Sequence, residues 1–160
     1  MTTRRLVLFV AALATMLAGC ATASAPVSVA DTIARDPQLS TLNGLVQKAG
    51  MAEMLKTSGP YTVFAPTNDA FKAVPAKTMD ELAADPARLK AVLAYHVVPA
   101  RLAAEQVKNQ EVKTAQGANL SLSKAGSFVT VEDAMVQTAD VGASNGVVHT
   151  IDRVLMPPRR

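Results

Sequence analysis

The order of periodic segments along the chain predicts an α+β fold with a mostly helical N-terminal half. In the first half of the 160-residue chain, apolar residues recur at three- and four-residue steps, as in helices. In the second half the spacing changes to the alternation that is typical of strands. Helices that come first and strands that come later are typical of α+β proteins. Without an internal repeat, the pattern predicts one domain, residues 29–157.

Start and stop signals locate the first helices. Asp36-Pro37 combines a good N-cap with a proline suited to the first helical position, and the apolar spacing that follows lasts until Gly50. Glycine just after the last periodic residue is a frequent helix end. We expect a second, shorter helix at residues 51–55, before Gly59-Pro60 interrupts the chain.

A strand, then a short helix, should follow. Residues 61–65 are aromatic and β-branched, which predicts a strand that ends at Pro66. Thr67 or Asn68 can cap the short helix that carries Phe71.

Two more helix starts precede the change of period. Thr78-x-x-Glu81 has the capping-box pattern, so one helix is expected to begin at Thr78. Asp85-Pro86 should open the next helix, and Pro99 should fix its end. The strands of the second half are expected around residues 120–123, 128–131, 135–136 and 147–151, with turns at Ala125-Gly126 and Asn145-Gly146.

The first nineteen residues have the pattern of a signal peptide. Arg4 and Arg5 precede an apolar run, residues 6–17, that is too short to span a membrane as a helix. Leu17-Ala18-Gly19-Cys20 resembles the lipobox of bacterial lipoprotein precursors, in which the cysteine is lipidated. An ordinary secretory signal is the alternative, although Pro26 suits its small-residue cleavage site poorly. We therefore predict a signal at 1–19, a lipid anchor at Cys20, a tether at 20–28 and a tail at 158–160.

Charge and cysteine content exclude several classes of function. Without Arg4 and Arg5 the chain has 14 basic and 13 acidic side chains. Binding to phosphate backbones requires clustered cations, so nucleic acid is not an expected partner. Cys20 is the only cysteine, which excludes a disulfide within the chain and a thiolate metal cluster.

Three segments together resemble the signature of the fasciclin (FAS1) domain family. They are Y-T-V-F-A-P-T-N-D-A-F at Tyr61–Phe71, L-A-Y-H-V-V-P at Leu93–Pro99 and S-N-G-V-V-H-T-I-D-R-V-L-M-P at Ser144–Pro157. The resemblance implies a wedge-shaped β-sandwich with packed helices. It also implies a non-catalytic protein that mediates adhesion or binds a protein or matrix partner.

The resemblance also supplies candidate contact residues. In animal members an Asp-Ile pair before the last segment, and aliphatic residues around the Tyr-His motif, have been assigned to receptor contact. The matching residues here are Tyr95, His96, Val97, Val98, Asp140 and Val141. For Asp140, a turn or cap residue that bonds nearby backbone is the alternative.

Other chemistries are weaker alternatives. His96 and His149 are far apart and lack further ligands at zinc-site spacing, so we expect structural histidines, no metal and no cofactor. Gly142–Gly146 matches G-x-S-x-G, but a hydrolase needs Ser144 on a strand-to-helix elbow, whereas a strand should follow here. We therefore expect no enzyme. A small-ligand pocket near Tyr95 and His96 remains an alternative.

The expected location is a bacterial cell envelope. Ala21 follows Cys20, and lipoproteins without an aspartate at this position resemble those sorted to the outer membrane. The protein would then face the periplasm or the cell surface, attached to the membrane through lipidated Cys20. The sequence identifies neither the binding partner nor the oligomeric state.

Overall fold

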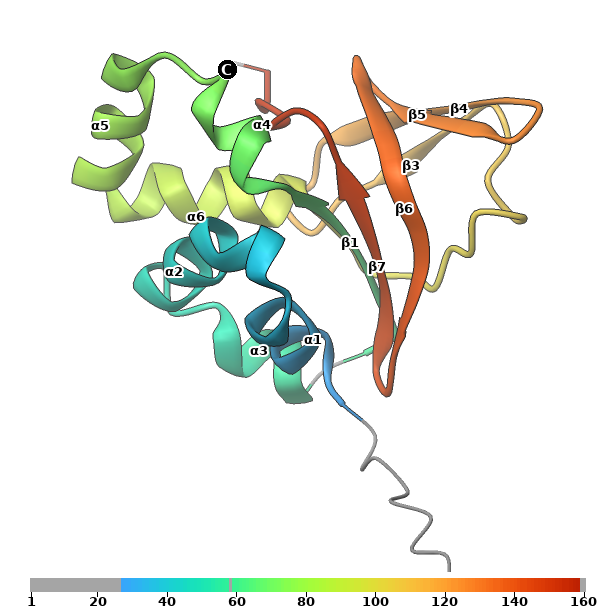
Figure 1. Cartoon of the computed structure of the whole chain (residues 1–160), viewed down its shortest axis with the longest axis horizontal. Helices are drawn as coiled ribbons and strands as arrows, with labels where there is room; N and C mark the ends of the chain where they lie inside the picture. Colours follow the sequence, from blue (N-terminus) through green and yellow to red (C-terminus); the bar gives the residue numbers. More distant parts are fainter. Residues whose placement is uncertain (1–26, 58, 159–160) are drawn as a thin grey trace, which may run out of the picture.

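The computed structural model describes residues 27–57 and 59–158 and confirms the α+β fold. Helices make up the first half of the described chain, and strands make up most of the second (Figure 1). The elements are α1 (Val29–Arg35), the 3₁₀ turn η1 (Pro37–Leu39), α2 (Ser40–Lys48), α3 (Ala52–Thr57), β1 (Tyr61–Pro66), α4 (Asn68–Lys72), α5 (Ala76–Ala84), α6 (Pro86–Tyr95), β2 (Val97–Val98), β3 (Gln110–Lys113), β4 (Asn119–Ala125), β5 (Phe128–Val131), β6 (Ala134–Ala143) and β7 (Gly146–Ile151).

The strands form one hydrogen-bonded series in the order β2-β1-β7-β6-β5-β4-β3. Strands β3 to β7 follow one another as an antiparallel meander. Strand β7 then pairs in parallel with β1, from Tyr61 opposite Gly146 to Pro66 opposite Ile151. This pairing places the last strand of the domain beside its first.

Strands β1 and β7 are covered on both faces, which makes them the centre of the fold. The helices lie against one face, and β3, β4 and β5 curl over the other (Figure 1). Val63 and Ala65 belong to the apolar core on the helix side, whereas Phe64 belongs to the core on the strand side. Parallel strands are typically covered on both faces, and here every residue of β7 and every residue of β1 after Tyr61 is buried.

Strand β4 shows the other type of strand, with one face in the core and one in solvent. Leu120 and Leu122 are buried in the strand-side core, whereas Ser121 and Ser123 are exposed. Because antiparallel sheets can leave one face wet, the strict alternation of the sequence predicts this arrangement.

Most helix boundaries follow the expected capping residues. The Asp36 carboxylate accepts from the Gln38 amide at 2.9 Å, and that of Asp85 accepts from the Ala87 and Arg88 amides at 3.0 and 3.1 Å. Gly50 has a φ of 66°, a left-handed conformation that glycine adopts without a steric cost. Helix α2, however, follows a 3₁₀ turn instead of starting directly at Pro37.

The prediction that a helix begins at Thr78 is wrong. Helix α5 begins at Ala76, and the Pro75 carbonyl accepts hydrogen bonds from the Thr78 and Met79 amides at 2.9 and 3.1 Å. A proline already fixes the φ that a helix start needs, so the helix begins before the capping-box pattern. The sequence analysis also did not identify α1, β2 or β3 as elements.

The predicted signal peptide at 1–19, the lipid anchor Cys20 and most of the predicted tether lie outside the described residues, as do Arg159 and Arg160 of the predicted tail. In the part of the chain that the structure describes, none of the helices has both the length and the apolar character required to cross a membrane.

Candidate functional site

The β1–β7 pairing brings together the three segments that the sequence analysis singled out. Residues 61–66 of the first segment and 146–151 of the last lie side by side along this pair, and the two residues of β2 pair with the other edge of β1. We call residues 61–71, 95–98 and 144–152 the signature seam. Most of its side chains are buried, so the polar ones must find partners within the protein.

Asn145 at the start of the last segment connects three elements. Its Oδ1 accepts from the Val29 amide at the start of α1 at 2.8 Å, and its Nδ2 donates to the Leu55 carbonyl in α3 at 2.7 Å. Its own carbonyl accepts from the Tyr61 amide at 3.0 Å. Helix ends leave such backbone groups without partners inside the helix, and one side chain here satisfies two of them.

An Asn-Gly turn suggests a glycine with a positive φ, but Gly146 does not have one. Close packing is the reason that this position requires glycine. A Cβ at this position would overlap the Tyr61 carbonyl oxygen and lie 3.0 Å from a methyl carbon of Val29. Gly142, four residues earlier in β6, has nothing within 4 Å of such a Cβ. Each residue of the Asn-Gly pair therefore has its own structural reason. Asn145 is required for its hydrogen bonds, and Gly146 is required because β7, β1 and α1 leave no space for a Cβ.

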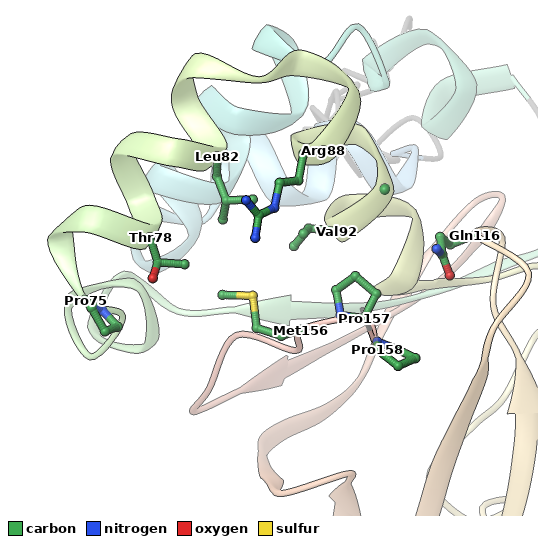
Figure 2. A pocket seen from close by; sticks show the side chains of 10 residues that line it. Pro75, Thr78, Leu82, Arg88, Val92, Gln116, Met156, Pro157 and Pro158 are labelled. Carbon is green, nitrogen blue, oxygen red and sulfur yellow. The ribbon is translucent and has the colours of Figure 1, made fainter. Parts of the chain in front are cut away.

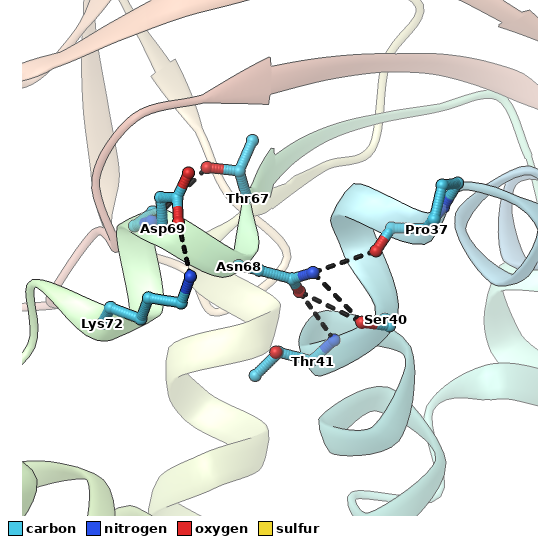
Figure 3. A network of polar contacts seen from close by, with 8 residues as sticks. Pro37, Ser40, Thr41, Thr67, Asn68, Asp69 and Lys72 are labelled. Carbon is cyan, nitrogen blue, oxygen red and sulfur yellow. Dashed lines mark hydrogen bonds and ion pairs between the residues drawn. The ribbon is translucent and has the colours of Figure 1, made fainter.

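Asn68 has the corresponding role in the first segment (Figure 3). Its Oδ1 accepts from the Thr41 amide at 3.0 Å, and its Nδ2 donates to the Pro37 carbonyl at 2.9 Å and approaches the Ser40 hydroxyl at 3.1 Å. Helix α2 has no side-chain cap of its own. Asn68 therefore caps this helix from a distant part of the chain.

His96 is a buried structural histidine with both ring nitrogens bonded. The Leu155 amide donates to Nε2 at 3.0 Å, so Nε2 carries no proton and Nδ1–H donates to the Val92 carbonyl at 2.8 Å. Burial lowers the pKa of His96 to about 4, opposed by the hydrogen bond to Val92, which raises it. The ring is therefore neutral at physiological pH and joins α6 to the segment after β7.

His149 is also bonded to backbone groups through both ring nitrogens. The Asp140 amide donates to its Nδ1 at 3.1 Å, and Nε2–H donates to the Leu102 carbonyl at 2.8 Å. Its ring stacks on Phe64 with the centroids 5.6 Å apart. Neither histidine is placed to act as a metal ligand, and the described residues contain no group of three or more His, Cys, Asp or Glu that could hold a metal.

Tyr95 lies at the end of α6 with its ring in the strand-side core. Its hydroxyl is 3.1 Å from the Asn119 carbonyl and 3.3 Å from Oε1 of Glu132. Burial, and then the negative charge of Glu132, raises the pKa of Tyr95 to about 12. Tyr95 also contributes to a shallow groove of about 400 Å³, whereas His96 is 2% exposed.

The six predicted contact residues lie in two different environments. Tyr95, His96, Val97 and Val98 are buried in the two cores or between them, so a partner could touch these side chains only after local opening. Asp140 is exposed and Val141 half-buried, at a bulge of β6 where Asp140 has a φ of 56°. Contact by these residues stays a prediction.

The alternative to a contact role for Asp140 was a turn or cap residue that bonds nearby backbone. Asp140 does bond a backbone group, but that group is distant in sequence. Its Oδ1 accepts from the Ala104 amide at 2.8 Å. Together with the bond from His149 to Leu102, this contact holds the segment between β2 and β3 against the sheet. Sequence reasoning missed this function because the partner lies 36 positions away.

Ser144 does not lie on a nucleophile elbow. It is in the turn of the antiparallel β6–β7 hairpin, and its amide donates to the Val27 carbonyl at 2.8 Å. A serine hydrolase places its nucleophile between a strand and a helix. The match to G-x-S-x-G reflects instead the Asn-Gly turn of the signature seam.

A second candidate surface lies on the solvent side of β4, β5 and β6. Register places Ser123, Thr130 and Met135 in one cross-strand row, with Phe128 next to it on β5. Phe128 is 62% exposed and Met135 44%, two of the three large hydrophobic side chains that the described chain leaves exposed. We call Ser121, Ser123, Ala125, Phe128, Thr130 and Met135 the outer face. No sequence motif marks the outer face, and only the alternation of β4 could have indicated it.

Comparisons with known proteins agree with this geometry. A family model described as the Fasciclin domain matches residues 37–157. "Protein sll1483" of Synechocystis sp. is 43% identical over 133 residues, which is 82% of this chain and 74% of the relative. The "Cell surface glycolipoprotein MPB83" of Mycobacterium bovis is 36% identical over 135 residues, 81% of this chain and 60% of the relative.

Animal proteins show the same likeness. "Transforming growth factor-beta-induced protein ig-h3" of Sus scrofa is 41% identical over 132 residues, 82% of this chain but 19% of that longer protein. Among solved structures, a FAS1 domain pair from the insect cell adhesion molecule Fasciclin I has a TM-score of 0.61 at 24% identity, covering 74% of this chain and 45% of the other. This last similarity is one of fold.

Proposed function

The chain belongs to the fasciclin domain family, and from this membership we propose that it is a non-catalytic adhesion module of a bacterial cell envelope. Its partner would be another protein or a matrix component. A relative described as a cell surface glycolipoprotein supports this role. The outer face is the observation that carries the proposal for this chain.

The composition of the outer face matches that of a protein contact surface. Its centre, formed by Phe128, Met135 and small uncharged side chains, contains no ionisable group. Charged residues lie at its edge, since Glu111 pairs with Ser121 across β3 and β4 and the Glu132 carboxylate accepts from the Ser121 amide. Protein interfaces are depleted of charge at their core, enriched in aromatic residues and methionine, and polar at the rim.

A non-catalytic role is supported by the bonding of the histidines. A general base needs a free ring nitrogen within reach of substrate. Both nitrogens of His96 and of His149 are bonded to backbone groups in the protein interior. Ser144, the remaining candidate, is in a hairpin turn.

The anchor is proposed to be a lipid on Cys20. Only a few residues separate this cysteine from Ser28, which caps α1, so the domain would stand close to the membrane. Several acyl chains on one residue give durable attachment, whereas one chain gives marginal binding. We expect Cys20→Ser to abolish acyl labelling and to leave unprocessed precursor; normal lipid incorporation would contradict the anchor.

The adhesion test uses full-length protein with Cys20→Ser, produced without the lipid and coupled to beads. Adhesion of the beads to whole cells of the source bacterium is measured for the double variant Phe128→Ser/Met135→Ser. We expect adhesion to fall at least tenfold, about 1.4 kcal/mol, because exposed aromatic and methionine anchors dominate such contacts.

Met156→Ser is the matched control, since Met156 is 43% exposed but lies outside the outer face. It should leave adhesion unchanged. A third variant, Val141→Thr, tests the predicted Asp140–Val141 contact separately. Adhesion lost in Val141→Thr and kept in the double variant would transfer the contact to the Asp140–Val141 bulge and contradict a role for the outer face.

A further inference from the structure

A groove of about 470 Å³ lies between the last two helices and the C-terminal segment (Figure 2). Pro75, Thr78 and Leu82 contribute from α5 and the turn before it, and Arg88, Ala91 and Val92 from α6. Met156, Pro157 and Pro158 form the opposite wall, and Gln116 closes one end. We call this cavity the tail groove. It is in the size range of small-molecule sites.

The side chains that line the tail groove are mostly apolar. Leu82 and Val92 are buried members of the helix-side core, and their groove-facing atoms continue its apolar surface. Met156, whose flexible thioether can adapt to irregular ligands, is 43% exposed on the opposite wall. Such a surface favours the hydrocarbon part of a ligand.

One cation projects into this apolar space. The guanidinium of Arg88 points toward Met156 in the centre of the groove (Figure 2). Its side-chain partner among the described residues is Glu81, through a single Nη1 contact of 3.2 Å. A guanidinium carries five N–H donors, so most of them are left for a ligand. Among the described residues that line the groove, none is acidic.

We propose that the tail groove binds a single-chain amphiphile with an anionic head group, such as a fatty acid. The hydrocarbon chain lies along Leu82, Val92 and Met156, and the head group accepts hydrogen bonds from Arg88. Thr78 and Gln116 provide further polar groups at the walls. This site is separate from the outer face and from the residues of the signature seam.

If the proposal is correct, affinity depends on two properties of the amphiphile, the length of its hydrocarbon chain and the charge of its head group. Full burial of one methylene contributes about 0.8 kcal/mol, or roughly a fourfold change in Kd. Affinity should therefore rise from octanoate to decanoate to dodecanoate, until the chain outgrows the groove. Dodecanol, which lacks charge, should bind at least tenfold more weakly than dodecanoate, because charge-assisted hydrogen bonds are the stronger kind.

The experiment follows methionine methyl NMR signals of the intact protein during titration with these amphiphiles below their micelle concentrations. Dodecanoate should shift the Met156 signal and leave the Met135 signal, on the outer face, unchanged. Dodecyl phosphate in place of dodecanoate distinguishes a lipid-like phosphate head group from a free carboxylate. Dodecyltrimethylammonium, the matched cation, should not bind.

Three substitutions and one control define the site. Arg88→Gln should weaken dodecanoate at least tenfold and leave dodecanol unchanged, because only the charged head group uses the guanidinium. Glu81→Gln should strengthen dodecanoate severalfold, since it removes the carboxylate that competes for Arg88. Ala91→Phe should fill the groove and weaken both ligands. Arg101→Gln, an exposed arginine elsewhere, is the control.

Several results would overturn the proposal. Equal affinity for dodecanoate and dodecyltrimethylammonium would mean nonspecific hydrophobic binding. An Arg88→Gln variant that binds dodecanoate normally would remove the head-group site. A Met156 signal that changes with protein concentration and not with amphiphile would assign the groove to a second copy of the chain.

Discussion

The signature seam and the outer face are built from opposite kinds of strand. Strands β1 and β7 are parallel and buried on both faces, and the buried polar side chains of the seam are bonded to backbone within the protein. Strands β4 and β5 are antiparallel and alternate between core and solvent, and Phe128 of β5 and Met135 of the neighbouring β6 are exposed. The residues that carry the family resemblance therefore hold the fold together, and the proposed contact surface lies apart from them.

This difference predicts that substitutions in the two regions have unequal consequences. Changes in Asn145 or Gly146 would disturb α1, α3 and β1 at once, because both residues contact several elements. Changes on the outer face disturb no buried contact. Surface substitutions of this kind have effects within about 0.5 kcal/mol.

Gly146→Ala tests the seam most severely. The added Cβ would overlap the Tyr61 carbonyl, and the parallel β1–β7 pair would have to separate. We expect a loss of more than about 4 kcal/mol in the free energy of unfolding, or no folded protein. Gly142→Ala is the control, because open space surrounds that position, and urea unfolding of both variants makes the comparison. Equal stabilities would contradict the close packing.

Acid should weaken the seam through His96. The unfolded state protonates this ring below pH 6.5, whereas the pKa of about 4 keeps it neutral in the folded state. Between these values the unfolded state binds more protons, so the free energy of unfolding falls as the pH falls. The contribution of His96 to this loss is on the order of 3 kcal/mol by pH 4.

The His96→Gln variant separates this effect from the titration of carboxylates. Glutamine can replace one ring hydrogen bond but has no proton to gain, so the variant should be less stable at pH 7 and lose less stability on acidification. Denaturant unfolding at several pH values measures both slopes. Parallel slopes for the two proteins would show that His96 already titrates normally when folded.

The two signature asparagines should differ in importance. Asn145→Ala removes partners from the Val29 amide and the Leu55 carbonyl, both partly buried, and should cost about 2 kcal/mol. Asn68→Ala removes a more exposed cap of α2 and should cost about 1 kcal/mol. Urea unfolding gives both values. If Asn68→Ala lowered the free energy of unfolding more than Asn145→Ala, the hydrogen bonds of Asn68 would be the more stabilising ones, contrary to this expectation.

The smallest effect on stability is expected on the outer face. Phe128→Ser/Met135→Ser should change the free energy of unfolding by no more than about 0.5 kcal/mol, since neither side chain is buried. Thermal unfolding of the double variant beside the unsubstituted protein tests this. A loss comparable to that of Asn145→Ala would mean that the outer face belongs to the stabilising core.

The sequence predicted the parts of the molecule whose causes are local. Asp85 and Gly50 mark helix ends because capping depends on neighbouring residues, and the alternation of β4 predicts its two faces. The parallel β1–β7 pair and the contact of Asp140 with Ala104 depend on residues far apart in the chain. No spacing rule gives such contacts, so the sequence could identify the important segments without showing that they are neighbours.

The most direct test is hydrogen exchange of two backbone amides that donate to His96. The Phe64 amide donates to the His96 carbonyl, and the Leu155 amide donates to Nε2 of its ring. If residues 95–98 are fixed in the core, both amides should exchange only through global unfolding. Their opening free energies should then equal the free energy of unfolding from denaturant titration. Opening that costs several kcal/mol less would show that the Tyr-His segment separates locally and can be presented to a partner, which would contradict a purely structural role.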